Sequence, residues 1–287
     1  MKRAVLVIGA TGTVGREVLA RLIALHEPVR AATRDPSRSL GTEAVRFDFE
    51  RPETFGPALQ GVDRVFLIAR PGDERADVFT VPLIDEMKRH EVRHVVNLSA
   101  MGTERADHTV ALRKIELHLE RSGIGFTHLR PNFFAQVFST GSLLAGIRTT
   151  GIIALPAADA RISFIDAIDV AEVAVAALRG PEHVGKARTL TGEQPINHAD
   201  VARIISTASG RAVRYVPLEE EDAREKLRRV GLPDERIERL IRFYRLVRAG
   251  EASSVSPSVR EILGRPATPF EDFVRRHAAL WTARPSE

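Results

Sequence analysis

Ala4-Val5-Leu6-Val7-Ile8-Gly9-Ala10-Thr11-Gly12-Thr13-Val14-Gly15 is the stretch that decides the fold of this 287-residue chain. Its first five residues are apolar and rich in β-branched side chains, which is typical of a strand buried on both faces of a parallel sheet. After the glycines, apolar side chains recur at helical spacing, at Val14, Val18 and Leu22. The sequence therefore predicts a buried strand, a glycine-rich turn and an amphipathic helix.

The predicted turn between that strand and that helix suits a bound pyrophosphate. Glycine tolerates positive φ and lets the backbone approach a ligand closely, and the start of a helix offers unpaired N–H groups and a positive dipole end. We therefore predict a dinucleotide site, and the residues of the turn that we expect to bind the cofactor are Gly9, Thr11, Gly12, Thr13, Val14 and Gly15. The alternative is a tight turn that binds no ligand.

The second predicted strand, residues 29–33, ends at Thr33-Arg34-Asp35, which bears on the choice of cofactor. An NAD-selective site usually places an acid at this strand end, on the ribose 2′-hydroxyl. Arg34 stands there instead, and a guanidinium can pair with a 2′-phosphate and stack on adenine. Arg38 can join it. We predict NADP(H) as the cofactor. The neighbouring Asp35 is the feature that favours NAD(H) instead. The alternative is a solvent-facing loop arginine.

Alternating strands and helices continue up to about residue 150. Strands are expected at 44–49, 63–68, 94–98 and 125–129, with helices at 73–90 and 107–121 among them. This alternation predicts an α/β protein with a Rossmann-like, doubly wound parallel sheet. Ligands of such sheets bind outside the carboxyl ends of the strands. We therefore expect the strand-end residues to converge on one crevice and contact the cofactor: Arg34, Asp48, Ile68, Ala69, Arg70, Ser99, Pro131, Asn132 and Phe133.

The sequence pattern changes after about residue 150. We expect residues 1–150 to form an NADP(H)-binding domain and residues 151–287 to form a smaller α+β substrate-binding lobe, partly interleaved with the first domain. Strands are predicted at 152–155, 161–165 and 214–217. Asn197 is predicted to cap one helix, and Asp169 to cap another with an acid at its third position, Glu172, as in a capping box.

Several segments together resemble the NmrA-like atypical short-chain dehydrogenases. Besides the glycine turn and Thr33-Arg34-Asp35, they are Leu129-Arg130-Pro131-Asn132-Phe133-Phe134, residues 165–171 and Gly264-Arg265-Pro266. That group includes NADPH:quinone oxidoreductases, azoreductase-like proteins, ergot-alkaloid reductases and NADP-sensing regulators. The resemblance extends over essentially the whole chain, and it implies NADP(H) binding without implying one reaction.

The sequence departs from the short-chain dehydrogenase pattern at the catalytic residues. Those enzymes use a serine and a Tyr-x-x-x-Lys pair on the helix after the fifth strand. Alignment on Glu116 and Ser122-Gly123 places His108 at the tyrosine position and Leu112 at the lysine position, so the pair is absent. If Lys114 is instead aligned with the lysine, Val110 falls at the tyrosine position, and the pair is again absent. Ser99 stands where the catalytic serine is expected.

We take Ser99 and His108 as the candidate catalytic residues. Ser99 would contact the substrate or the nicotinamide, and its alternative role is to satisfy backbone groups at a strand end. His108 would protonate the reduced substrate, since the pKa of histidine lies near neutrality. It is expected on one helical stripe with Leu112, Ile115 and Leu119. The alternative is a histidine that faces a wall of the cleft.

Two functions from different classes are compatible with these residues. The first is an NADPH-dependent oxidoreductase that transfers hydride to an electrophilic small molecule, namely a quinone, azo compound, iminium or activated enone. Such acceptors need little help from a general acid, which typically contributes about 10² to 10⁴ in rate. The second is a non-catalytic NADP(H)-binding redox sensor or regulator.

Composition argues against several other classes. The chain has no cysteine, which excludes disulfides, thiolate metal sites and a cysteine nucleophile. Its 42 basic and 38 acidic residues are nearly balanced, which gives little support to nucleic-acid binding. No apolar run approaches the length of a membrane span. We expect a soluble, cytoplasmic protein with a small-molecule substrate, no metal, and no nucleic-acid or membrane partner. A homodimer is left open.

Overall fold

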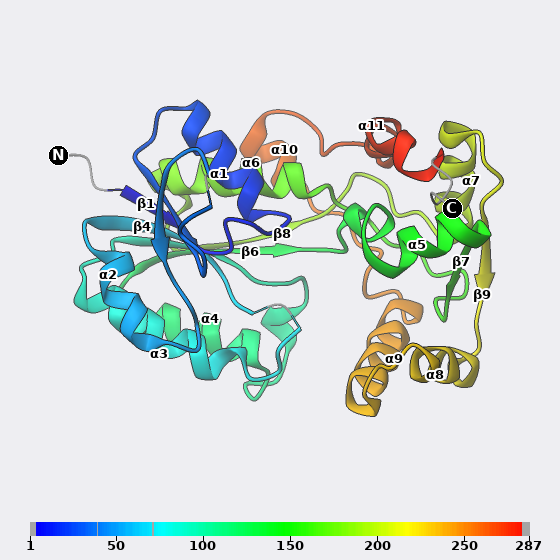
Figure 1. Cartoon of the computed structure of the whole chain (residues 1–287), viewed down its shortest axis with the longest axis horizontal. Coiled ribbons are helices and arrows are strands. Elements are labelled where there is room, and N and C mark those ends of the chain that lie inside the picture. Colours follow the sequence, from blue (N-terminus) through cyan, green and yellow to red (C-terminus); the bar gives the residue numbers. More distant parts are fainter. Residues whose placement is uncertain (1–3, 39, 71, 283–287) are drawn as a thin grey trace. The chain divides into compact units, whose positions relative to one another are not determined.

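The computed structural model describes residues 4–38, 40–70 and 72–282, and the chain forms two compact units (Figure 1). Unit 1 is drawn from Met1–Pro131, Ala167–Leu190 and Pro257–Arg265. Unit 2 is drawn from the remaining segments, Asn132–Asp166, Thr191–Ser256 and Pro266–Glu287. The first boundary thus lies at residues 131 and 132, whereas the sequence pattern indicates about residue 150.

A parallel sheet forms the centre of unit 1 and confirms the predicted Rossmann-like fold. Over the described residues it has seven strands in the order β3-β2-β1-β4-β5-β6-β8, and all neighbours are parallel. The strand order reverses between β1 and β4, which is where sheets of this kind bind their ligands. The strands are β1 (Ala4–Val7), β2 (Val29–Thr33), β3 (Glu43–Arg46), β4 (Val62–Ile68), β5 (His94–Leu98), β6 (Gly125–Pro131) and β8 (Lys186–Leu190).

Helices cover both faces of this sheet. In Figure 1, α1, α6 and α10 lie on one face and α2, α3 and α4 on the other. Apolar residues of the central strands, such as Leu6, Val65 and Val95, are fully buried between these layers. The helices are α1 (Gly15–Ala24), α2 (Phe55–Leu59), α3 (Ala76–Arg89), α4 (Ala111–Arg121), α6 (Ala167–Arg179) and α10 (Ser258–Leu263), with short 3-10 turns at Pro52–Thr54, Thr103–Arg105 and Pro181–His183.

Unit 2 is mainly helical and has its own apolar core. The Trp281 side chain is fully buried there, and its indole Nε1 donates a hydrogen bond to the Phe138 carbonyl at 2.9 Å. Its elements are the parallel pair β7 (Ile152–Leu155) and β9 (Arg214–Pro217), the helices α5 (Gly141–Thr150), α7 (His198–Ser209), α8 (Glu220–Arg229), α9 (Asp234–Arg248) and α11 (Phe270–Thr282), and a 3-10 turn at Ala135–Phe138.

Two strand assignments differ from the sequence prediction. The expected strand at 161–165 is absent from the described structure, where Ile162 and Ile165 form only isolated bridges to Ile196 and Phe134. Strand β8 was not predicted. It lies at the sheet edge and its first residues are exposed, so its sequence, Lys-Ala-Arg-Thr-Leu, lacks the apolar run of a central strand.

Two predicted helix caps have opposite outcomes. The Asn197 cap is confirmed, because its side-chain oxygen accepts a hydrogen bond from the Asp200 N–H at 2.8 Å. The Asp169 capping box is wrong, because α6 already begins at Ala167. The buried Asp169 carboxylate instead accepts a hydrogen bond from Nη2 of Arg265 at 2.8 Å.

In the described residues, no helix is long and apolar enough to cross a membrane.

Candidate dinucleotide site

The turn between β1 and α1 is built so that only glycine fits at its two ends. Gly9 has a φ of +75°, and a Cβ there would lie 3.3 Å from Cδ1 of Ile68 at the end of β4. A Cβ at Gly15 would lie only 2.1 Å from the Gly9 carbonyl oxygen. The first turn of α1 therefore packs directly on the backbone of Gly9, which is the close approach that the third glycine of such a turn permits.

Backbone N–H groups remain available in this turn. Gly12 N–H donates to the Gly9 carbonyl at 2.8 Å, whereas the N–H groups of Thr13, Val14 and Gly15 make no hydrogen bond within the described chain. Val14 is at the N-cap position of α1 and provides no side-chain cap. Unpaired donors at a helix start bind phosphate oxygens. The residues present thus fit the pyrophosphate of a dinucleotide.

The end of β2 carries an arginine without a partner and an aspartate that is already engaged. Arg34 is exposed, and its guanidinium makes no hydrogen bond or ion pair to the residues that the structure describes. Asp35 Oδ1 accepts hydrogen bonds from the Ser37 hydroxyl at 2.5 Å and the Ser37 N–H at 3.1 Å. These bonds, with a smaller contribution from the charge of Arg38, lower the pKa of Asp35. The carboxylate that argued against NADP(H) is therefore engaged in a local turn.

The next strand ends are more constrained by local contacts. Asp48 follows β3, and its Oδ1 accepts a hydrogen bond from the Glu50 N–H at 3.1 Å. Arg70 pairs with Glu50 at 2.9 Å, and its guanidinium lies 4.7 Å from the ring centroid of Phe79. Ala69 is buried. The structure thus brings Ile68 against the glycine turn, while Asp48 and Arg70 already have protein partners.

Ser99 lies at the end of β5 beside a buried ion pair. The residue is 8% exposed, and its hydroxyl makes no hydrogen bond of ordinary geometry within the described structure. Glu116 of α4 is fully buried, and its carboxylate accepts two hydrogen bonds from Arg130, at 2.9 and 2.8 Å, and one from Arg113 at 3.1 Å. Burial alone would raise the pKa of Glu116, but the hydrogen bonds and the positive charge of Arg130 hold it below its usual value.

The ion pair between Glu116 and Arg130 was not predicted from the sequence, in which Glu116 was only a point of alignment. The available signal was Arg130, a charged residue between the apolar residues Leu129 and Pro131, since an arginine buried in a strand requires an acidic partner. The pair connects α4 to β6 next to Ser99, and Ser99 N–H donates to the Leu129 carbonyl at 2.8 Å. Ser99 is therefore held by the strand on one side and lies close to a fixed carboxylate on the other.

His108 does not lie on a helix, which corrects the sequence prediction. Helix α4 begins at Ala111, so His108 is outside the stripe formed by Leu112, Ile115 and Leu119. Asp107 Oδ1 accepts a hydrogen bond from the Thr109 N–H at 2.8 Å and closes a turn where a first helical turn was expected. The His108 side chain is 82% exposed, with its Nδ1 3.6 Å from the Asp107 carboxylate.

Pro131, Asn132 and Phe133 span the boundary between the two units. Pro131 ends β6 in unit 1, whereas Asn132 and Phe133 belong to unit 2. The Asn132 side-chain amide donates to the Ser163 hydroxyl at 2.7 Å and to the Ala252 carbonyl at 2.8 Å. The Phe133 ring stacks on Phe243 with centroids 4.6 Å apart. The side chains of Asn132 and Phe133 thus have partners inside unit 2.

A parallel sheet, a glycine turn with unpaired N–H groups and an arginine after the second strand define a dinucleotide-binding protein of the Rossmann-like class. Residues 9–181 match the family described as NAD(P)H-binding, and the chain belongs to that family. Within it, the chain is an NmrA-like atypical short-chain dehydrogenase, as its sequence motifs indicated.

The comparisons with individual proteins extend over almost the whole chain. It is 32% identical to an NAD(P)H azoreductase of Xenophilus azovorans, with 97% of this chain and 99% of that protein covered. It is 36% identical to a (4-alkanoyl-5-oxo-2,5-dihydrofuran-3-yl)methyl phosphate reductase of Streptomyces griseus, with 96% and 98% covered. The structure of Citrobacter sp. triphenylmethane reductase complexed with NADP(H) has a TM-score of 0.82 at 23% identity, with 96% and 100% covered.

Proposed function

We propose that this protein is an NADPH-dependent oxidoreductase that transfers hydride to an electrophilic small molecule, such as a quinone, azo compound, iminium or activated enone. The observation that carries the proposal is the glycine turn, whose unpaired N–H groups belong to the same unit as an unpartnered Arg34. The similarity to two reductases over nearly the whole chain supports a redox reaction rather than binding alone.

The residues of unit 1 have distinct roles in this proposal. The N–H groups of Thr13, Val14 and Gly15 hold the pyrophosphate, and Arg34 and Arg38 hold the 2′-phosphate. The other strand-end residues of this unit line the cofactor, namely Asp48, Ile68, Ala69, Arg70, Ser99 and Pro131. Bound NADPH supplies the hydride. Unit 2 binds the substrate, which is the role expected from the sequence for the smaller lobe. We further propose a cytoplasmic setting and a homodimeric assembly.

An electrophilic acceptor is favoured because the usual proton-donating pair is missing. No Tyr-x-x-x-Lys occurs at the expected place on α4, and the exposed His108 lies before the helix begins. Ser99 is the polar side chain that remains at this strand end. A reduced quinone or azo nitrogen is a weaker base than a simple alkoxide, so it needs less help from a general acid.

Replacing Arg34 with alanine is expected to weaken NADPH binding by about tenfold to a hundredfold and to leave NADH binding nearly unchanged. The reason is the loss of a charge-assisted bond to the 2′-phosphate, worth roughly 1.5–3 kcal/mol. Fluorescence titration with both cofactors measures the effect. Arg46→Ala, which removes another exposed arginine of the same unit, is the control. Equal losses of NADPH and NADH affinity would contradict a 2′-phosphate role for Arg34.

Hydride transfer from bound NADPH to a panel of quinones tests the proposed reaction. An oxidoreductase consumes NADPH in proportion to the quinone added, and the absorbance of NADPH falls with multiple turnovers. A sensor binds the cofactor and leaves it unconsumed. Tight NADPH binding without turnover of any quinone, azo compound, iminium or enone would overturn the proposal and favour the regulatory alternative.

His108→Phe is expected to change quinone reduction by less than about threefold, because an 82% exposed side chain outside α4 is poorly placed to act as a general acid. Turnover of one quinone is measured from pH 6 to 8, and a weak pH dependence is expected in both proteins. His118→Phe, at a half-buried histidine on α4, serves as a control. A loss of about two orders of magnitude with NADPH affinity intact would make His108 the proton donor.

A further inference from the structure

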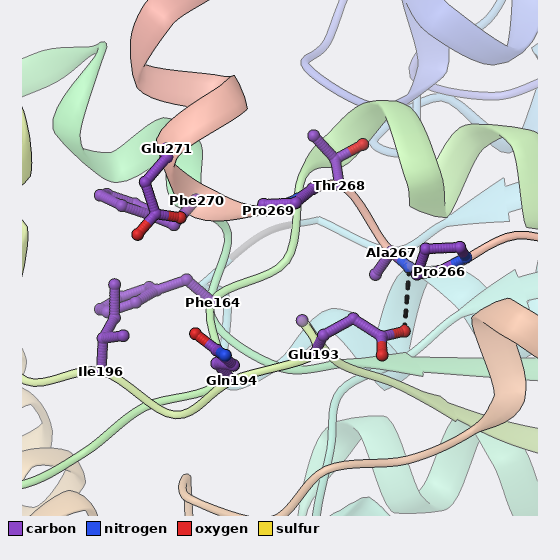
Figure 2. A pocket seen from close by; sticks show the side chains of 11 residues that line it. Phe164, Glu193, Gln194, Ile196, Pro266, Ala267, Thr268, Pro269, Phe270 and Glu271 are labelled. Carbon is purple, nitrogen blue, oxygen red and sulfur yellow. Dashed lines mark hydrogen bonds between the residues drawn. The ribbon is translucent and has the colours of Figure 1, made fainter. Parts of the chain in front are cut away.

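Unit 2 contains a cavity of about 420 Å³ that the proposed cofactor site does not use (Figure 2). All of its lining residues belong to that unit. They come from Phe164, from the segment 192–196 that follows β8, and from the segment 266–271 that leads into α11. A volume of this size lies in the range typical of small-molecule sites.

One wall of the cavity is aromatic and held in place by the core. The rings of Phe164 and Phe270 have centroids 5.7 Å apart and are tilted by 43° to each other. Both rings also make edge contacts with the buried Phe138. Ile196 and Pro269 extend this apolar surface. The wall is thus a preformed apolar surface of two tilted rings against which an aromatic ligand can pack.

The charged part of the lining is acidic, beside the neutral polar side chains of Gln194 and Thr268. Glu193 and Glu271 contribute carboxylates, and no lysine, arginine or histidine is among the residues that line the cavity. Glu193 is fixed by the Ala267 N–H, which donates to its Oε1 at 3.1 Å, the dashed line in Figure 2. A fixed carboxylate at one side of an apolar cavity favours a cation and disfavours an anion.

Glu271 carries the second negative charge and is not neutralised by its own helix. It lies in the first turn of α11, and in Figure 2 its carboxylate points toward Phe164. Arg275, one turn further along, pairs with Asp272 instead. In the described part of the chain, the Glu271 carboxylate has no hydrogen-bond or ion-pair partner. A positively charged group of a ligand could therefore pair with the Glu271 carboxylate.

We propose that the cavity binds an aromatic cation, a small ligand with one or two fused rings and a protonated amine or another positive group. The rings pack against Phe164 and Phe270, whose faces attract a positive charge, and the cation is oriented by Glu271 and Glu193. This inference goes beyond the redox function, and its test needs neither NADPH nor turnover.

The test is calorimetric titration of the full chain, without cofactor, with three naphthalene probes that differ in charge. They are 1-naphthylmethylammonium, 1-naphthalenemethanol and 1-naphthoate at neutral pH. The cation is expected to bind about tenfold more tightly than the alcohol, and the anion most weakly. Equal affinities for the three probes, or no binding of the cation, would overturn the proposal while leaving the hydride-transfer assay unaffected.

Variants locate the site. Glu271→Gln is expected to weaken binding of the cation about fivefold and to leave binding of the alcohol unchanged. Glu235→Gln is the matched control, because Glu235 is also an exposed glutamate in the first turn of a helix of unit 2 and does not line the cavity. Equal effects of the two substitutions would count against the site.

A cavity-filling variant gives an independent readout. Ile196→Trp places an indole in the space that the ligand needs, so binding of both the cation and the alcohol is expected to fall below detection. Thermal unfolding shows whether the variant folds. Cation binding that persists in folded Ile196→Trp would place the ligand elsewhere and overturn the proposal.

Discussion

Gly15→Ala is expected to weaken binding of NADPH and NADH alike by at least about a hundredfold. The new Cβ would lie 2.1 Å from the oxygen and 2.6 Å from the carbon of the Gly9 carbonyl, and both are backbone atoms. The start of α1 must then move away from the turn, which displaces N–H groups whose bonds to phosphate are worth roughly 1.5–3 kcal/mol each. Fluorescence titration with both cofactors measures the loss.

The same substitution is expected to lower the free energy of unfolding by about 1–3 kcal/mol, the usual cost of overpacking. Gly56→Ala is the control, because a Cβ at Gly56 in α2 would meet its nearest atom, Oε1 of Glu86, at an ordinary 3.4 Å. Its cofactor affinity should equal that of the wild type, and its stability should equal or slightly exceed it. If Gly15→Ala binds both cofactors as tightly as the wild type, the proposed binding of the pyrophosphate at this turn is wrong.

Glu116→Ala is expected to destabilise the protein by about 3–5 kcal/mol. It removes the carboxylate that holds the Arg130 guanidinium and leaves that largely buried group only a longer contact, 3.5 Å, with Glu104. Urea unfolding at neutral pH gives this free energy. Glu225→Ala, which breaks an exposed pair with Arg229, should cost less than about 1 kcal/mol. In the double variant Glu116→Leu, Arg130→Met, much of the stability should return, since no unpaired charge remains. An effect of Glu116→Ala as small as that of Glu225→Ala would contradict the buried pair.

The stability contributed by Glu116 should also depend on pH in a defined direction. Its pKa in the folded protein is lowered from the ordinary value of 4.5. The stabilisation is therefore fully present above about pH 4.5 and is lost as the pH falls through the lower folded-state pKa. The difference in stability between the wild type and Glu116→Ala should shrink on acidification in that window.

The sequence alone was sufficient for the central part of unit 1 and for the conformation of the glycine turn. β1 is a continuous apolar run, and β2, β4 and β5 each contain a short apolar stretch beside polar residues, so all four could be located from residue type. The glycine turn was equally readable, because positive φ and close backbone approach are local requirements that only glycine meets. Arg34 could be placed at its strand end because Thr33 closes β2 in the sequence pattern and in the structure.

The tertiary structure decided what depends on residues far apart in the chain. Asp169 looked like a helix cap because its neighbours suit a capping box, but Arg265, 96 residues away, binds it inside the helix. His108 lies outside the helix for a local reason, because the Asp107 carboxylate accepts a hydrogen bond from the Thr109 N–H and α4 begins only at Ala111.

Edge strand β8 and the acidic cavity of unit 2 show the same limit. Their residues carry no local pattern, since pairing with β6 and the joining of three separate segments create them. Local propensity and spacing therefore determined the sheet, the turn and the cofactor class of this protein. Long-range pairing of charges and packing of distant segments determined which side chains are buried, paired or left available to bind a ligand.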